Sequence, residues 1–382
     1  MKPSFVILTL LGFLLVSFVV TGFQCGSPSL TSAKLYINNT DWENAEKSLT
    51  AEVEKNPANA EAWYLLGNVR LQRRNFAGMV EAYDKSAPLS PEFAEKIKST
   101  KSNLWVLMMQ HGIGCYNHSL KVSADSVSMF RDSAITDYQN AIVVAPDSII
   151  GYQNLALAQH ANSKYDDEIN TLKIGLERKK DPEVYATLIN VYIQKAQMAK
   201  TAGNNDEATK NYDNAIASLT EARALQPDNI ELLGILINLY IETGRAKDAV
   251  PLIREAITKD PQNKVFQNDL GLLLMQTEEF EEATQHFEAA IATDPTYEDA
   301  LWNGAIAYMK WGDKVKKTAG ENADAKDYVP KFKSAVKLTE KLVALKKDEA
   351  KYWEGLGTAY ANAGMTKEAQ KAYEQAAALE KK

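Results

Sequence analysis

The chain has few cysteines and histidines, and its prolines and glycines are not concentrated in any segment. Its 382 residues include only two cysteines, Cys25 and Cys115, and four histidines. No intramolecular disulfide is possible if Cys25 is lipidated, so packing must then hold the fold together. The 12 prolines and 19 glycines form no low-complexity tract, which argues against a long disordered linker. The net charge of −7 argues against nucleic acid as a partner, because neutralising phosphates requires a concentrated basic surface.

Motifs of enzymatic chemistry are also missing from the sequence. It contains no HExxH, no CxxC or CxxCH, and no glycine-rich phosphate loop. The many Asp and Glu residues follow a helical spacing that is typical of a solvated surface. We therefore expect no enzymatic activity, no cofactor and no small-molecule substrate.

A pattern of about 34 residues recurs along the chain. Each copy has a large apolar residue followed four places later by a small one. After these two residues come an alanine, then an aromatic residue or leucine, then a second alanine and finally a proline. The spacing of the alanines and the aromatic residue places all three on one helix face. The pattern is clearest at Trp63, Gly67, Tyr83 and Pro91, at Gly271, Ala283, Phe287, Ala290 and Pro295, and at Trp353, Gly357, Tyr360, Ala369, Tyr373 and Ala376.

This period and residue order resemble the tetratricopeptide repeat (TPR) family, in which each repeat is a helix hairpin that stacks on its neighbours. The resemblance implies an all-α fold, a right-handed α-solenoid of about nine hairpins that forms a single domain over residues 25–382. When the recurring proline is taken as the thirty-second residue of each repeat, the predicted repeats are 26–59, 60–93, 94–148, 149–181, 182–229, 230–263, 264–297, 298–349 and 350–382.

Three of these repeats, 94–148, 182–229 and 298–349, are longer than 34 residues. In the second of them the apolar spacing continues on both sides of a stop signal at Gly203, which predicts that each helix is longer by seven residues. Seven residues are nearly two helical turns, so the packing faces stay in phase. We expect three hairpins with elongated helices.

The N-terminal segment has the features of an export signal. Lys2 precedes an uncharged apolar stretch from Phe5 to Phe23, and Cys25 follows directly. This arrangement resembles the processing site of a bacterial lipoprotein, which implies removal of residues 1–24 and lipidation of Cys25. An uncleaved signal anchor is an alternative, because a membrane-spanning helix needs about 20 residues, and secretion without an anchor is another. The lipoprotein reading predicts a membrane-anchored protein of the bacterial cell envelope, either periplasmic or in the outer membrane.

The TPR resemblance also implies where a partner binds, because the first helix of each repeat lines a concave groove in that family. Its groove positions carry a mixture of amide and apolar side chains in this sequence. A side-chain amide can both donate to and accept from an extended peptide backbone, which predicts a partner that binds as an extended segment. The predicted groove residues are Tyr64, Asn68, Gln153, Leu157, Asn190, Ile193, Asn238, Ile241, Asn268, Met275, Trp302 and Met309.

A histidine–cysteine cluster is the one candidate metal site. His111, Cys115 and His118 are spaced i, i+4 and i+7, and His160 takes a corresponding position in the next repeat. This alignment takes Gly114 as the small residue of the helix. Four such ligands could hold zinc or copper. A free cysteine is more often a small buried hydrophobic residue, so we do not favour a metal here.

The sequence therefore favours a membrane-anchored, non-catalytic scaffold that binds protein partners through an extended segment. Two alternatives stay open. One is a structural subunit of an envelope or secretion assembly, and the other is a metal-binding carrier that uses the histidine–cysteine cluster.

Overall fold

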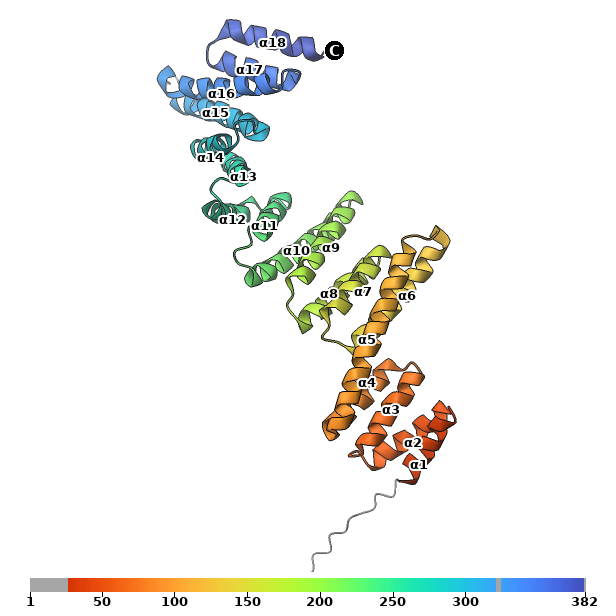
Figure 1. The fold of residues 1–382 in the computed structure, drawn as a ribbon. Coiled ribbons are helices and arrows are strands. Elements are labelled where there is room, and N and C mark those ends of the chain that lie inside the picture. The colour runs from red at the N-terminus through yellow and green to blue at the C-terminus, as the bar shows by residue number, and fades with distance from the viewer. Residues whose placement is uncertain (1–26, 321–323, 381–382) are drawn as a thin grey trace, which may run out of the picture. The chain divides into compact units, whose positions relative to one another are not determined.

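The computed structural model describes residues 27–320 and 324–380, and this part of the chain is helical without any strand (Figure 1). The proposed signal segment 1–24 and Cys25 lie outside it. The helices are α1 (Pro28–Asn38), α2 (Trp42–Lys55), α3 (Ala60–Gln72), α4 (Phe76–Ser86), the 3-10 helix η1 (Ala87–Leu89), α5 (Pro91–Ser119), α6 (Ala124–Val144), α7 (Ile149–Ala161), α8 (Tyr165–Arg178), α9 (Pro182–Thr201), α10 (Asn205–Leu225), α11 (Ile230–Glu242), α12 (Ala246–Lys259), α13 (Lys264–Gln276), α14 (Phe280–Thr293), α15 (Glu298–Ala319), α16 (Ala325–Leu345), α17 (Ala350–Asn362) and α18 (Thr366–Glu380).

The α-helices follow one another in pairs that coincide with the nine predicted repeats, which confirms the all-α solenoid class. The chain divides into two compact units, one up to Ser163 with α1–α7 and one from Lys164 with α8–α18. In the first unit α1 packs on α2, α3 on α4 and α5 on α6. In the second unit the five hairpins from α9/α10 to α17/α18 pack in the same way, each against the next.

Local signals in the sequence explain where the helices begin and turn. Asn75, Asn204 and Asn263 each precede a helix, and their side chains accept hydrogen bonds from backbone N–H groups of its first turn. Gly203, in the tight turn between α9 and α10, has φ of 77°, a left-handed conformation that glycine adopts without steric cost. The turns at Asn75 and Asn204 fold the second helix of a repeat back on the first, and the turn at Asn263 leads from one repeat into the next.

Small residues on the first helix let the second helix approach closely. A Cβ atom on Gly67 would lie 2.4 Å from the ring of buried Tyr83, and one on Gly271 would lie 2.7 Å from the ring of Phe287. In these two repeats the aromatic ring of the second helix therefore packs directly on a glycine backbone, as the repeat pattern predicts.

In the third repeat the predicted alignment is wrong by two residues. Gly112, and not Gly114, lies under the Tyr138 ring of the partner helix. A Cβ atom on Gly112 would lie 2.7 Å from this ring, whereas a Cβ atom on Gly114 would meet nothing within 4 Å. The helix also begins at Pro91, three residues before the predicted boundary at 94. Pro91 suits the first position of a helix because its missing N–H would have no intrahelical partner there.

The three predicted elongated hairpins are confirmed as α5/α6, α9/α10 and α15/α16. α9 has 20 residues and α10 has 21, against 13 in α11 and 14 in α12, so each of the two is longer by the predicted seven. α5 is the longest helix described, with 29 residues. Among the described residues, no helix combines the length and apolar character needed to cross a membrane.

Candidate binding surface and the His111–Cys115–Asp137 cluster

Two predicted groove residues of the first unit are engaged in packing. The ring of Tyr64 stacks on Phe93 with centroids 4.8 Å apart, and the Asn68 carbonyl oxygen accepts a 2.6 Å hydrogen bond from the Tyr83 hydroxyl. Burial raises the pKa of Tyr83, which keeps this hydroxyl protonated as the donor. Further along, Gln153 is half-buried and Leu157 on α7 is 49% exposed.

In the second unit, two predicted groove positions repeat the same pair of side chains at the surface. Asn190 on α9 and Asn238 on α11 are both exposed, and Ile193 and Ile241 lie three residues further on, half-buried. Neither amide makes a side-chain hydrogen bond within the described part of the chain. The two helices are joined near their C-terminal ends, where Lys200 Nζ lies 3.4 Å from Glu242 Oε1.

A tyrosine supports the same junction from the second helix of the repeat. The Tyr212 hydroxyl donates a 2.8 Å hydrogen bond to Glu242 Oε1. Burial and the bond to the Glu242 carboxylate raise the pKa of Tyr212 to about 12. The Glu242 carboxylate therefore links α9, α10 and α11.

The remaining predicted groove residues belong to the interior of the second unit. Asn268 is 4% exposed, and its carbonyl oxygen accepts a 3.1 Å hydrogen bond from Asn303. The Trp302 ring packs edge-on against Tyr352 with centroids 5.2 Å apart. Met275 and Met309 are half-buried against the hydrophobic core. Periodicity alone could not separate these positions from surface ones. Asn268 and Trp302 stand at the fifth residue of their repeats and Met275 and Met309 at the twelfth, and both positions share a predicted helix face with the ninth residue, which is Asn190 or Asn238 in other repeats.

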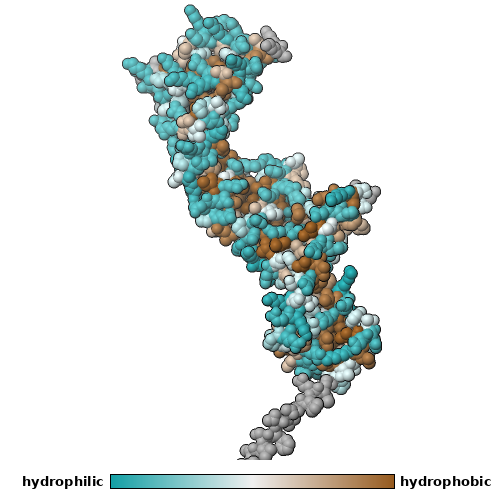
Figure 2. Space-filling model, in the orientation of Figure 1, coloured by the Kyte–Doolittle hydropathy of each residue, from teal (hydrophilic) through white to brown (hydrophobic). Residues whose placement is uncertain are grey.

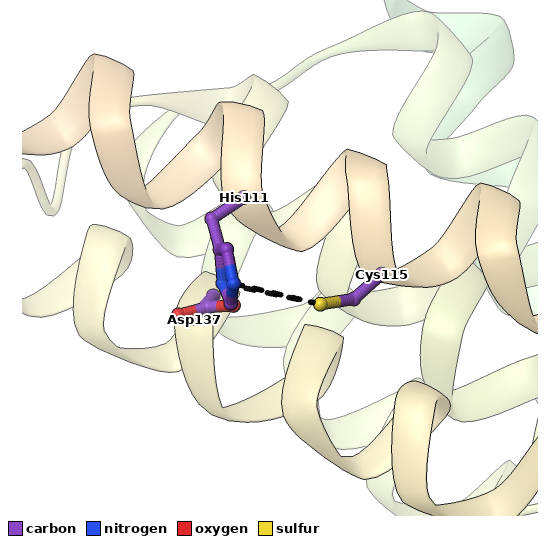
Figure 3. Close-up of side chains that lie close together, drawn as sticks. All are labelled: His111, Cys115 and Asp137. Carbon is purple, nitrogen blue, oxygen red and sulfur yellow. Dashed lines mark hydrogen bonds and ion pairs between the residues drawn. The ribbon is translucent and has the colours of Figure 1, made fainter. Parts of the chain in front are cut away.

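The predicted histidine–cysteine cluster forms only in part. His111 and Cys115 lie together on α5, with Cys115 Sγ 3.9 Å from both ring nitrogens of His111. Asp137, on the facing helix α6, completes the group with its Oδ2 atom 2.6 Å from His111 Nδ1 (Figure 3). Ser133 Oγ lies 3.6 Å from Cys115 Sγ.

The other two predicted ligands lie apart from this group. The His118 ring packs edge-on against Phe130 with centroids 4.4 Å apart, and His160 is not among the three clustered residues. Asp137 is not part of the predicted ligand set because it lies on the partner helix, 22 residues after Cys115. Predicting that Asp137 faces His111 requires the register between the two long helices, which the sequence pattern does not give.

A cavity of about 590 Å³ lies beside the cluster. His111, Ser133 and Asp137 line it together with apolar residues that include Leu104 and Leu107. The His111 side chain is 67% exposed, and that of Asp137 is 21% exposed. His111 is therefore accessible to solvent, while the side chain of Asp137 is mostly covered by neighbouring residues.

Comparison with known families identifies the repeats. Family models described as tetratricopeptide repeat match residues 30–92, 207–270, 243–305 and 350–382. The chain is built from tetratricopeptide repeats. The TPR repeat-containing protein YpiA of Bacillus subtilis (strain 168) is 28% identical to this TPR chain over 164 residues. That match covers 42% of the chain and 35% of YpiA, so it spans about a third of the relative.

Several solved structures match about half of the chain. A crystal structure of MamA protein is 21% identical with a TM-score of 0.40, covering 50% of this chain and 92% of MamA. MamA from Desulfovibrio magneticus RS-1 is 18% identical with a TM-score of 0.39, covering 50% and 95%. YrrB, titled a TPR protein with an unusual peptide-binding site, is 18% identical with a TM-score of 0.38, covering 55% and 93%. None of these matches indicates an enzymatic family.

Proposed function

We propose that this TPR protein is a membrane-anchored, non-catalytic scaffold of the bacterial cell envelope that binds an extended segment of a partner protein. The TPR fold supports interaction with proteins in general. The observation that carries the finer proposal is the repeated pair Asn190/Ile193 and Asn238/Ile241 on successive first helices of the second unit.

Each pair combines the two kinds of contact that an extended peptide needs. The exposed amide can donate to a backbone carbonyl and accept from a backbone N–H, and the half-buried isoleucine offers an apolar surface for a side chain. Both pairs lie on helices that pack against α10, since α10 contacts α9 and α11, and the ion pair between Lys200 and Glu242 also links α9 to α11. Recognition through the main chain would tolerate varied partner sequences.

Anchoring is proposed from the sequence of the N-terminal segment. The apolar stretch from Phe5 to Phe23 followed by Cys25 fits a lipoprotein signal, with Cys25 as the lipidated residue. Metabolic labelling of the expressed protein with a fatty-acid analogue tests this assignment. Label that disappears in Cys25→Ser supports it, and label that persists in this variant contradicts it.

The binding proposal is tested by pull-down with Asn190→Ala and Asn238→Ala. A specific partner recovered by the wild-type protein should be lost when both asparagines are replaced. Asn170→Ala is the matched control, because Asn170 is equally exposed but lies on α8, the second helix of its repeat. Equal recovery by the double variant and the wild type would overturn the peptide-groove assignment.

A second candidate function is supported by apolar side chains on the long hairpin of the first unit. Leu107 on α5 is 63% exposed and Met129 on α6 is 62% exposed, and Figure 2 shows hydrophobic residues at the surface of this unit. Such side chains favour a structural subunit that assembles through α5/α6. Sedimentation at micromolar concentration tests it. Self-association that is weakened by Leu107→Glu supports assembly, and a monomer at all concentrations contradicts it.

A further inference from the structure

We propose that His111, Cys115 and Asp137 form a binding site for a single zinc ion. The three side chains offer one imidazole nitrogen, one thiolate sulfur and one carboxylate oxygen, and these atoms all lie within 4.8 Å of one another. The site differs from the predicted ligand set, since Asp137 replaces both His118 and His160. It lies in the first unit and does not depend on the peptide-binding surface proposed on α9 and α11.

The donor atoms are near enough to one another for side-chain rotations to bring them to the separations of a tetrahedral zinc site. Zinc bonds of about 2.0 Å to nitrogen and oxygen and about 2.3 Å to sulfur place neighbouring donors roughly 3.3 to 3.6 Å apart. Here Cys115 Sγ lies 3.9 Å from the His111 nitrogens, and His111 Nδ1 lies 2.6 Å from Asp137 Oδ2. A small side-chain rotation that opens the hydrogen bond between His111 and Asp137 would admit the ion between all three.

The mixture of donors selects the class of metal. A thiolate is a poor ligand for magnesium or calcium, which prefer oxygen, whereas zinc accepts sulfur, nitrogen and oxygen together. Copper(I) favours sulfur ligands and gains little from the Asp137 carboxylate. Zinc, with cobalt(II) as its spectroscopic substitute, is therefore the ion that uses every donor present.

The two long helices hold the donors in place before any ion arrives. His111 and Cys115 are one turn apart on α5, and Asp137 faces them from α6. Gly112 lies between the two α5 donors and lets Tyr138, the neighbour of Asp137, pack against the α5 backbone. This close contact fixes the register between the helices, so the site is built on rigid elements rather than on loops.

Three protein ligands leave one position of the tetrahedron open. His111, Ser133 and Asp137 line the cavity of about 590 Å³, so a fourth ligand can enter from there. Closed structural zinc sites take all four ligands from the protein, whereas a site with three protein ligands holds water or another small ligand in the fourth position. A bound zinc ion would therefore accept water or a donor group from a ligand in the cavity.

The experiment is a metal titration of the full chain in detergent after treatment with a chelator. Zinc alone, followed by calorimetry, should bind with one equivalent. Cobalt(II) alone should give a thiolate charge-transfer band in the near ultraviolet. Cys115→Ser and Asp137→Asn keep the shape of the side chain, and each should weaken zinc binding by about tenfold or more, since loss of even an outer-shell partner costs 10–100-fold.

His118→Gln is the matched control, because His118 also lies on α5 but contacts Phe130 instead of the cluster. This variant should keep full zinc affinity, and helical circular dichroism should be unchanged in all three proteins. The charge-transfer band should vanish in Cys115→Ser although Cys25 is still present. The proposal is overturned if the wild type shows no saturable zinc binding, if Cys115→Ser keeps the band, or if His118→Gln weakens binding as much as Asp137→Asn.

Discussion

At the scale of single residues, two glycines on α5 have opposite surroundings although they are only two positions apart. Gly112 lies against the Tyr138 ring, where a built Cβ would approach to 2.7 Å, and Gly114 faces open space. Overpacking a close contact costs about 1–3 kcal/mol, whereas replacing a helical glycine by alanine in open space gains roughly 0.5–1 kcal/mol. Gly112→Ala should therefore lower the unfolding midpoint, and Gly114→Ala should raise it.

Urea unfolding followed by circular dichroism measures both variants under the same conditions. The pair also tests the register of the third repeat, because the sequence pattern assigns the packing role to Gly114. If Gly114→Ala were the destabilising variant, the contact between α5 and α6 would be misplaced, and the position of Asp137 opposite His111 would be wrong with it.

The pH dependence of stability has a residue-scale component at Asp294. Hydrogen bonds from Lys264 and Thr296 lower the pKa of this carboxyl from 3.8 to about 2 in the folded protein. Because the folded pKa is the lower one, Asp294 stabilises the fold above about pH 4, and this contribution is lost as the pH falls from 4 to 2.

Thermal unfolding at several pH values measures this contribution. Asp294→Asn should lower the midpoint at pH 6, and most of the difference from wild type should be lost by pH 2, where the folded carboxyl is about half protonated. Asp228→Asn serves as control, because Asp228 is 97% exposed beside Lys259 and such pairs contribute little. A midpoint difference for Asp294→Asn that stays constant from pH 6 to pH 2 would contradict the assignment.

The residue-scale predictions from sequence succeed where contacts are local to one repeat. Gly67 under Tyr83 follows directly from the 34-residue pattern, because both positions keep their spacing from the repeat proline. The pattern fails at Gly112, since the insertion in the third repeat shifts this spacing. It also cannot show that Asn268 is buried, because burial depends on the neighbouring repeat and not on the helix that carries the residue.

At the scale of helices, Pro251 lies inside α12 as its sixth residue. A proline at this depth lacks the N–H that would bond to the Lys247 carbonyl, and its ring crowds that carbonyl. Proline in a helix interior is about 3 kcal/mol less favourable than alanine. Pro251→Ala should therefore stabilise the protein by roughly 1–3 kcal/mol.

Urea unfolding compares this variant with Pro182→Ala. Pro182 is the first residue of α9, where a backbone N–H would have no intrahelical partner, so its replacement should give no comparable gain. Equal changes in the free energy of unfolding for the two variants would contradict the prediction, because they would show that the effect of a proline does not depend on its position in the helix.

Helix lengths were the most predictable feature at this scale. Gly203 ends α9 where the sequence expects it, and the extension of seven residues in both α9 and α10 keeps the packing face in phase. α5 differs because it begins early, at Pro91. The short 3-10 helix η1 connects α4 to α5, and the repeat pattern contains no such connection.

At the scale of the whole molecule, the proposed function has successive first helices face the partner. Each repeat packs mainly on its immediate neighbours, so under this proposal the binding residues recur at the interval of one repeat. Asn190 and Asn238 are the exposed pair that follows this rule in the second unit. The sequence predicts the repeats and these positions, while the identity of a partner is not encoded in the repeat pattern.

Site-specific photocrosslinking in cells tests the central claim of a scaffold that binds an extended segment. A photoreactive amino acid placed at position 190 or 238 should give adducts with one and the same segment of a partner protein, identified by mass spectrometry. The same group at position 170 should give none. Adducts of equal yield from position 170, or unrelated proteins captured at 190 and 238, would contradict the claim.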